Sequence, residues 1–152
     1  MKALATNKKA LFNYISLDEY EAGLALKGWE VKSIKSGNVS LKESYVTLRD
    51  NEAWLVGAHV ARWPGMGQAE PGVETRERKL LLHRSEISKL QTGLNQRGHT
   101  LIPIDMHMKG NVVKLRLALA RGKKLHDKRQ KLKEKDQKRS IERDIKNFGL
   151  KE

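Results

Sequence analysis

Residues 44–60 read Ser44-Tyr45-Val46-Thr47-Leu48-Arg49-Asp50-Asn51-Glu52-Ala53-Trp54-Leu55-Val56-Gly57-Ala58-His59-Val60 and carry the clearest β-hairpin pattern in the chain. Two runs rich in β-branched and aromatic residues flank Asp50-Asn51, and these two residue types tolerate the positive φ angles of a tight turn. A strand pair at this point predicts that neighbouring segments pair in the same antiparallel way.

A second hairpin is predicted from residues 100–108 and 112–120. Val112 and Val113, followed by alternating polar and apolar residues, favour a strand, although the leucine- and alanine-rich end of this run would also suit a helix. Pro103 has no N–H to donate to a neighbouring strand, which suggests an edge strand or the start of a strand.

The N-terminal segments are predicted to alternate between strand and helix. Residues 11–17 mix aromatic and branched residues with polar ones and indicate a first strand, and residues 29–36 indicate another. Between them we expect a short helix that is capped by Ser16 or Asp18 and closed by Gly28.

The middle of the chain predicts a loop followed by a helix. Residues 61–75 contain two prolines and three glycines and should form an irregular surface excursion. Ser85 is the expected N-cap of the helix, and Gly98 should end it. Its apolar positions follow helical spacing: Ile87, Leu90 and Leu94.

Six or seven short strands and only two or three helices predict a mainly β protein. We expect a closed antiparallel β-barrel of the oligonucleotide-binding (OB) type, with helices packed against its openings. Residues 1–120 would form this body, and residues 121–152 a basic C-terminal tail. The tail has too few apolar side chains to offset an ordering cost of ~1–2 kcal/mol per residue, so alone it should be disordered or a frayed helix, and a partner must order it.

The charge of the chain indicates a polyanionic partner. The 152 residues carry a formal net charge of +13. The tail holds thirteen Lys and Arg against six Asp and Glu, a net charge of +7, and the body holds the remaining +6. A basic segment on a basic domain is typical of proteins that bind nucleic acid through counterion release.

Other classes of site find little support in the sequence. The chain has no cysteine, so thiolate metal sites and cysteine nucleophiles are excluded. We predict no catalytic residues, no metal site and no cofactor, because no nucleophile, base and oxyanion donors cluster and no phosphate-binding motif is present. No run of eighteen apolar residues occurs, so a soluble cytoplasmic protein is expected. The histidines lack metal-ligand spacing: His59, His83, His99, His107 and His126.

The few aromatic residues and the tail leave alternatives open. Exposed aromatic side chains beside lysines stack on unpaired RNA bases. Core positions are favoured for Trp29 and Trp54, whereas Tyr14 and Tyr45 suit either role. If the tail became helical, a stripe of three apolar residues would suit RNA-induced folding or a membrane-surface helix equally: Ile141, Ile145 and Phe148.

Several motifs together resemble the SsrA-binding protein (small protein B) family over nearly the full length. The resemblance is carried by Asn7-Lys8-Lys9-Ala10, Tyr14, Glu21-Ala22-Gly23-Leu24, Gly28-Trp29-Glu30-Val31-Lys32-Ser33, Ser44-Tyr45-Val46, Arg78-Lys79-Leu80-Leu81-Leu82 and Gly122-Lys123-Lys124 followed by His126-Asp127-Lys128-Arg129. The resemblance implies an OB-like barrel, a tail that is unstructured in isolation, and binding of transfer-messenger RNA during trans-translation, the rescue of ribosomes stalled on broken messages.

The resemblance also implies a division of labour between body and tail. The body would hold the elbow of the tRNA-like domain through Asn7, Lys8, Tyr14, Glu21 and Tyr45. The tail would probe the decoding centre and the empty message channel of the small ribosomal subunit, against its RNA. There Lys123, Lys124, Lys128 and Arg129 would hold phosphates and His126 would stack on a base, within the motif that Gly122 and Asp127 complete. The family pattern has an aromatic residue where this chain has His107.

Three alternative functions stay open on the residues alone. A different ribosome-associated OB-fold protein would bind the ribosome without the tRNA-like RNA. An RNA-modifying enzyme would turn over substrate, and a membrane-surface protein would become helical on anionic vesicles without RNA selectivity.

Overall fold

The computed structural model describes residues 3–123, and this part of the chain is mainly β. The predicted tail beyond Lys123 lies outside the described residues. In chain order the elements are β1 (Ala3–Thr6), α1 (Lys8–Asn13), β2 (Tyr14–Leu24), α2 (Gly28–Lys35), β3 (Val39–Ser40), β4 (Tyr45–Arg49), β5 (Glu52–Val56), β6 (His59–Val60), the 3-10 turn η1 (Val73–Thr75), β7 (Arg78–Leu81), α3 (Arg84–Leu94), β8 (His99–Lys109) and β9 (Val112–Gly122).

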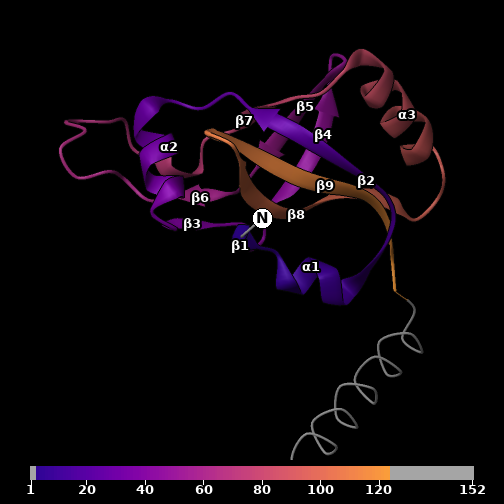
Figure 1. Ribbon diagram of the computed structural model, residues 1–152. Coiled ribbons are helices and arrows are strands. Elements are labelled where there is room, and N and C mark those ends of the chain that lie inside the picture. Colours follow the sequence, from indigo (N-terminus) through magenta and orange to yellow (C-terminus); the bar gives the residue numbers. More distant parts are fainter. Residues whose placement is uncertain (1–2, 124–152) are drawn as a thin grey trace, which may run out of the picture. The chain divides into compact units, whose positions relative to one another are not determined.

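Seven strands form one antiparallel sheet in the order β1-β8-β9-β2-β7-β5-β4, and β3 pairs separately with β6 (Figure 1). Among the described residues β1 and β4 stay at the two edges of this sheet. The predicted closure of the barrel is therefore not confirmed, because no strand pairing within residues 3–123 joins β1 to β4. The sheet nevertheless curls enough for β4 to lie against β8.

Both predicted hairpins are present. Asp50 and Asn51 have φ angles of 51° and 61°, so both occupy the left-handed region that a two-residue hairpin turn requires. The β8–β9 hairpin extends to Gly122, two residues past the predicted strand. The position expected for Pro103, on an edge strand or at the start of a strand, is wrong, since β8 begins at His99 and lies between β1 and β9. Pro103 is tolerated because the register shifts between it and Asp105, and β1 pairs only from Asp105 onward.

The N-terminal elements differ from the prediction. The segment 11–13 belongs to helix α1, the predicted helix after Ser16 is part of strand β2, and residues 29–35 form helix α2 instead of a strand. Strand β2 is held by long-range pairing with β9 from Tyr14 to Gly23, which outweighs local helix signals. Gly28 consequently begins a helix instead of ending one.

Helix α3 is confirmed, with different ends. Its N-cap is His83 instead of Ser85, and it stops at Leu94, four residues before Gly98. Leu90 is fully buried beneath it. Gly93 allows the close approach of α3 to β9, because a Cβ atom at this position would collide with the side chain of Leu119.

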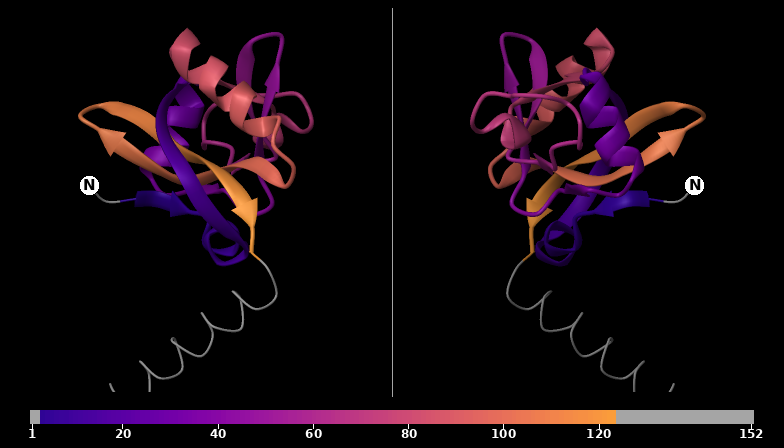
Figure 2. Two further views of the ribbon diagram at one scale, coloured as in Figure 1. Left: turned by 90° about the vertical axis from the view of Figure 1, so that its right-hand side faces the viewer. Right: turned by 90° about the vertical axis from the view of Figure 1, so that its left-hand side faces the viewer.

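The β8–β9 hairpin separates two apolar clusters. Alternate residues of β9 point to opposite faces, so Leu115 and Leu117 join the main core with Ile34 of α2 and Leu90 of α3. The other face, called the outer face below, carries a smaller cluster beneath α1. Figures 1 and 2 show α1 and α3 on opposite sides of this hairpin. The smaller cluster consists of Ala10, Ile102, Ile104, Ala118 and Ala120.

The predicted excursion over residues 61–75 is irregular apart from η1 and projects beside α2 (Figure 1). A buried ion pair holds its base: Arg78 Nε lies 2.6 Å from Glu30 Oε2, and both side chains are fully buried. Arg76 also pairs with Glu30. Burial by itself would raise the pKa of Glu30, but hydrogen bonds from Arg76, the Lys27 backbone and Arg78 outweigh it and leave that pKa lowered.

Candidate nucleic-acid interface

Helix α1 is fixed on the outer face by Asn7. The Asn7 side chain accepts a hydrogen bond from the Ala10 backbone N–H at 3.3 Å and donates one to the Pro103 backbone oxygen at 3.1 Å. Its own backbone N–H donates to Ile104 at 2.8 Å. Asn7 is only 5% exposed, so its first role is to cap α1 and attach the helix to β8.

Beside the start of α1 a groove of about 340 Å³ carries three lysines, and we call it the lysine groove. Lys8 and Lys9 come from α1, and Lys42 follows β3. All three are exposed, and none forms an ion pair with another described residue. Unpaired lysines that converge from two elements suit the phosphates of a nucleic acid. The remaining lining residues are Ala5, Thr6, Asn7, Val39, Ser40 and Leu41.

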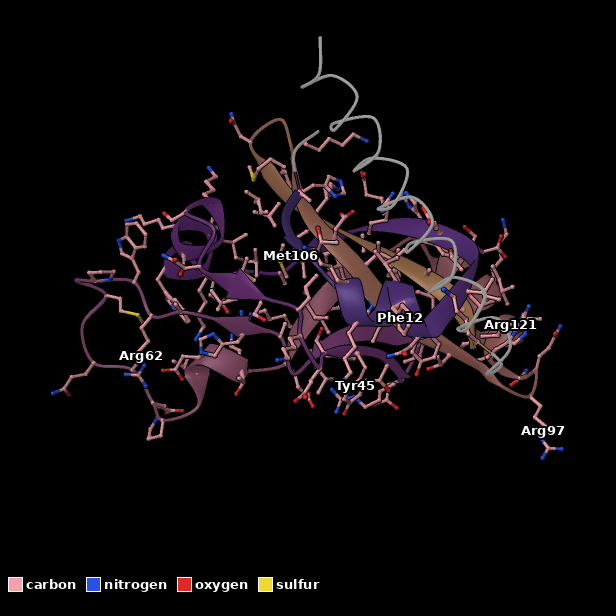
Figure 3. All side chains as sticks on the ribbon, turned by 90° about the horizontal axis from the view of Figure 1, so that it is seen from below. Phe12, Tyr45, Arg62, Arg97, Met106 and Arg121 are labelled. Carbon is pink, nitrogen blue, oxygen red and sulfur yellow. The ribbon has the colours of Figure 1, made fainter. Side chains whose placement is uncertain are left out.

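A neighbouring groove of about 210 Å³, which shares Asn7 and Lys9 with the lysine groove, holds two tyrosines, and we call it the tyrosine groove. Tyr45 is 53% exposed, while Tyr14 is half-buried and packs against the small cluster under α1. Figure 3 shows Tyr45 beside α1, where Phe12 is labelled. A tyrosine ring half open to solvent can stack on an unpaired base. The groove is also lined by Asn7, Lys9, Ala10, Asn13, Glu43, Ser44, Thr100, Leu101 and Ile102.

Four of the five predicted body residues, Asn7, Lys8, Tyr14 and Tyr45, thus lie around α1. The fifth, Glu21, does not: it lies seven residues along β2 from Tyr14, about 23 Å at ~3.3 Å per residue. Its carboxylate accepts from His107 Nε2 at 3.0 Å and from Lys109 Nζ at 3.2 Å. These hydrogen bonds, that of His107 first, lower the pKa of Glu21.

His107 is 7% exposed, and its other ring nitrogen, Nδ1, lies 2.9 Å from Asp105 Oδ1. Both ring nitrogens are therefore occupied, and the ring has no free face for stacking on a base. The aromatic residue of the family pattern is here replaced by a polar bridge between two carboxylates.

Only the start of the predicted tail motif can be placed. Gly122 ends β9 and pairs with Tyr14 at the start of β2, so the chain leaves the body beside the tyrosine groove. Lys123 is the last described residue. The predicted sites at Lys124, His126, Asp127, Lys128 and Arg129 lie outside the described residues.

The two tryptophans with predicted core positions differ. Trp29 packs against the main core. Trp54 is half-buried on the face of β5 that points away from the main core, with the Arg49 guanidinium 5.1 Å from the centre of its ring. Trp54 therefore makes a cation–π contact on the sheet surface and does not pack in the core.

Within residues 3–123, no group of three or more His, Asp or Glu side chains could hold a metal ion. No helix in the same part of the chain is long and apolar enough to cross a membrane.

Comparison with known proteins decides the family. The family model described as SmpB protein matches residues 4–147. The chain belongs to the SmpB family. A relative from Coxiella burnetii (strain Dugway 5J108-111), named SsrA-binding protein, is 45% identical over 97% of this chain and 93% of its own length. SsrA-binding proteins of Fusobacterium nucleatum (45% identity, 95% of this chain and 97% of the relative) and Oleidesulfovibrio alaskensis (47%, 93% and 91%) are similar.

A solved SmpB-family structure agrees with the fold. It is reported as "tmRNA-SmpB: a journey to the center of the bacterial ribosome" and superposes with a TM-score of 0.64 at 38% identity, covering 79% of this chain and 84% of that chain. The sequence resemblance to this family is confirmed.

Sequence reasoning missed Lys9 and Lys42 as candidate site residues. Lys9 stands next to Lys8 in the quoted motif and could have been included. Lys42 is far from α1 in sequence, and only the packing of β3 near β1 brings it to the lysine groove.

Proposed function

We propose that this protein binds transfer-messenger RNA and takes part in trans-translation, the rescue of stalled ribosomes. The observation that carries this proposal is the match to the SmpB family over residues 4–147, together with relatives named SsrA-binding protein. The proposed role is binding and delivery, without catalysis, and it takes place in the cytoplasm, where ribosomes work.

In this proposal the body grips the tRNA-like domain through the surface around α1. The lysine groove would hold backbone phosphates, and the tyrosine groove would stack an unpaired base on Tyr45 and Tyr14. Asn7 supports both grooves by fixing α1, because it lines each of them and is itself almost fully buried. The curled sheet would act as an OB-like barrel whose outer face, beneath α1, is turned to the RNA.

The tail, residues 121–152, would act at the ribosome. Its net charge of +7, from thirteen basic and six acidic residues, suits the phosphates of small-subunit RNA. An intact message would fill the channel, whereas an empty channel would admit the tail. The motif that starts at Gly122, at the end of β9, and runs to Arg129 would then contact the decoding centre.

Truncation after Lys123 tests this division, because it keeps β9 and its pairing with Tyr14 complete. We expect the truncated chain to retain most of the affinity for the tRNA-like domain and to lose tagging of stalled peptides in a reconstituted translation system. A truncated chain that supports full tagging would contradict the role of the tail. A full-length chain with no affinity for the tRNA-like domain would contradict the proposed function itself.

A further inference from the structure

An ionic cluster crosses three strands of the outer face beyond α1. Strand β2 contributes Glu19 and Glu21, β9 contributes Arg116, and β8 contributes three residues. The links are Arg116 to Glu19 at 3.6 Å, Arg116 to Asp105 at 2.8 Å, Asp105 to His107 at 2.9 Å, His107 to Glu21 at 3.0 Å and Glu21 to Lys109 at 3.2 Å.

His107 lies at the centre of this cluster with a carboxylate at each ring nitrogen. An ionised carboxylate only accepts hydrogen bonds, and a neutral imidazole has a single N–H. Only the doubly protonated ring can therefore donate to Asp105 and to Glu21 at the same time. In the neutral ring, one carboxylate would face a nitrogen lone pair.

The two carboxylates would respond differently to loss of that proton. The Asp105 side chain is 12% exposed and is also held by Arg116. The Glu21 side chain is 34% exposed, and its other partner, Lys109, is 62% exposed. Glu21 is therefore the side chain free to turn away, since an exposed lysine pair holds it weakly.

The Glu21 carboxylate also keeps acceptor capacity beyond these two contacts. A carboxylate offers about four lone-pair directions, and His107 and Lys109 use two of them. An amino group on a base edge or a ribose 2′-hydroxyl could donate to the rest. Such a contact needs a fixed carboxylate, because an unfixed side chain loses rotamer freedom on binding.

We propose that His107 is a positioning residue for RNA recognition: its doubly protonated ring orients Glu21 toward the RNA, and the RNA affinity of this face falls when that proton is lost. This inference rests on the proposed function. It makes RNA binding depend on pH through one side chain.

The charged groups around His107 predict the same direction of change in RNA affinity when the proton is lost. Asp105, Glu21 and Glu19 face the cluster as carboxylates, and Lys109 and Arg116 face it as cations. Lys114 stands opposite His107 in the strand register, and β1 places the uncharged Ala3 beside it. Loss of the His107 proton adds negative charge to a surface that meets RNA phosphates, which also weakens binding.

The test is the affinity of the full chain for the tRNA-like domain of transfer-messenger RNA, measured by fluorescence anisotropy at constant ionic strength. From mildly acidic to mildly alkaline pH, we expect the wild-type affinity to fall roughly three- to fivefold. The His107→Gln variant should bind the RNA weakly, with an affinity that does not change across this pH range. The affinity of the Glu21→Gln variant should also be independent of pH. Adding His107→Gln to this variant should cause no further loss of RNA affinity.

His59→Gln is the matched control, because His59 is exposed on β6 and outside the cluster; it should keep the wild-type pH dependence. If His107→Gln fails to fold, as thermal unfolding would reveal, the exposed Glu21→Gln variant alone carries the test. A pH dependence that persists in either variant overturns the inference while leaving the proposed function intact. Absence of RNA binding at every pH overturns both.

Discussion

The side-chain amide of Asn7 donates a hydrogen bond to the backbone oxygen of Pro103, 96 residues later, at 3.1 Å. The same side chain caps α1 through the Ala10 N–H. Asn7→Ala removes both hydrogen bonds and should lower the free energy of unfolding by about 1–2 kcal/mol. Urea denaturation measures this loss. Asn111→Ala, at an exposed position in the β8–β9 turn, should change stability little; an equal loss in both variants would contradict the anchoring role of Asn7.

Neutralising the lysine groove should weaken RNA binding in a salt-dependent way. Each of Lys8→Gln, Lys9→Gln and Lys42→Gln should lower the affinity for the tRNA-like domain, and each should reduce the slope of log affinity against log salt by about 1. Lys89→Gln, at an exposed position on α3, should leave the slope unchanged. If Lys42→Gln behaves like this control, the lysine groove is not a phosphate site.

Removing the exposed tyrosine ring should weaken RNA binding without unfolding the protein. Tyr45→Ala should cost about 1–3 kcal/mol of RNA binding free energy, whereas Tyr45→Phe keeps the stacking surface and should bind nearly as well as wild type. Leu81→Ala is the control, since Leu81 is equally exposed, at 53%. An equal loss for Tyr45→Phe and Tyr45→Ala would mean that the hydroxyl, and not the ring, makes the contact.

The buried Glu30–Arg78 pair should make stability depend on acid. Glu30→Gln leaves the buried Arg78 guanidinium uncompensated and should cost about 3–5 kcal/mol near neutral pH. The pKa of Glu30 is lower in the folded than in the unfolded state, so the pair's contribution is present above the unfolded pKa and is lost as pH falls through the folded pKa.

The destabilisation by Glu30→Gln should therefore shrink as the pH is lowered through the acidic range, which urea denaturation at a series of pH values can follow. Glu77→Gln breaks the exposed pair with Arg49 and should have little effect at any pH. A constant difference between Glu30→Gln and wild type at all pH values would contradict the assignment of the stabilisation to this ion pair.

The hairpins could be predicted from sequence because their signals are local. The two residues Asp50 and Asn51 are enough to specify their turn. The alternation of polar and apolar residues after Val112 matches a strand with one buried and one exposed face. Strand β2 could not be predicted in this way, because its partner β9 lies about a hundred residues later in the chain. Helix α1 did have a local signal: Asn7 is a favourable N-cap that the aromatic residues after it obscured.

Some parts of the candidate site could likewise be predicted from the sequence, and others could not. The family motif supplied Lys8, Tyr14 and Tyr45, which the structure brings around α1. The ionic cluster could not be predicted, because Glu21 and His107 meet only through the strand order β8-β9-β2 and the register shift after Pro103. Trp54 lies on the solvent-facing side of β5. A core position was expected for it, but the sequence alone did not show which face of this strand is buried.

Selectivity for RNA shape is the most direct test of the whole account. The affinity of the full chain for the tRNA-like domain should be compared with that for an unstructured RNA of equal length at the same salt concentration. We predict a clear preference for the tRNA-like domain, which Tyr45→Ala reduces, because base contacts add to the non-specific attraction of a +13 chain. Equal affinity for the two RNAs would contradict the account, since charge alone would then explain the binding.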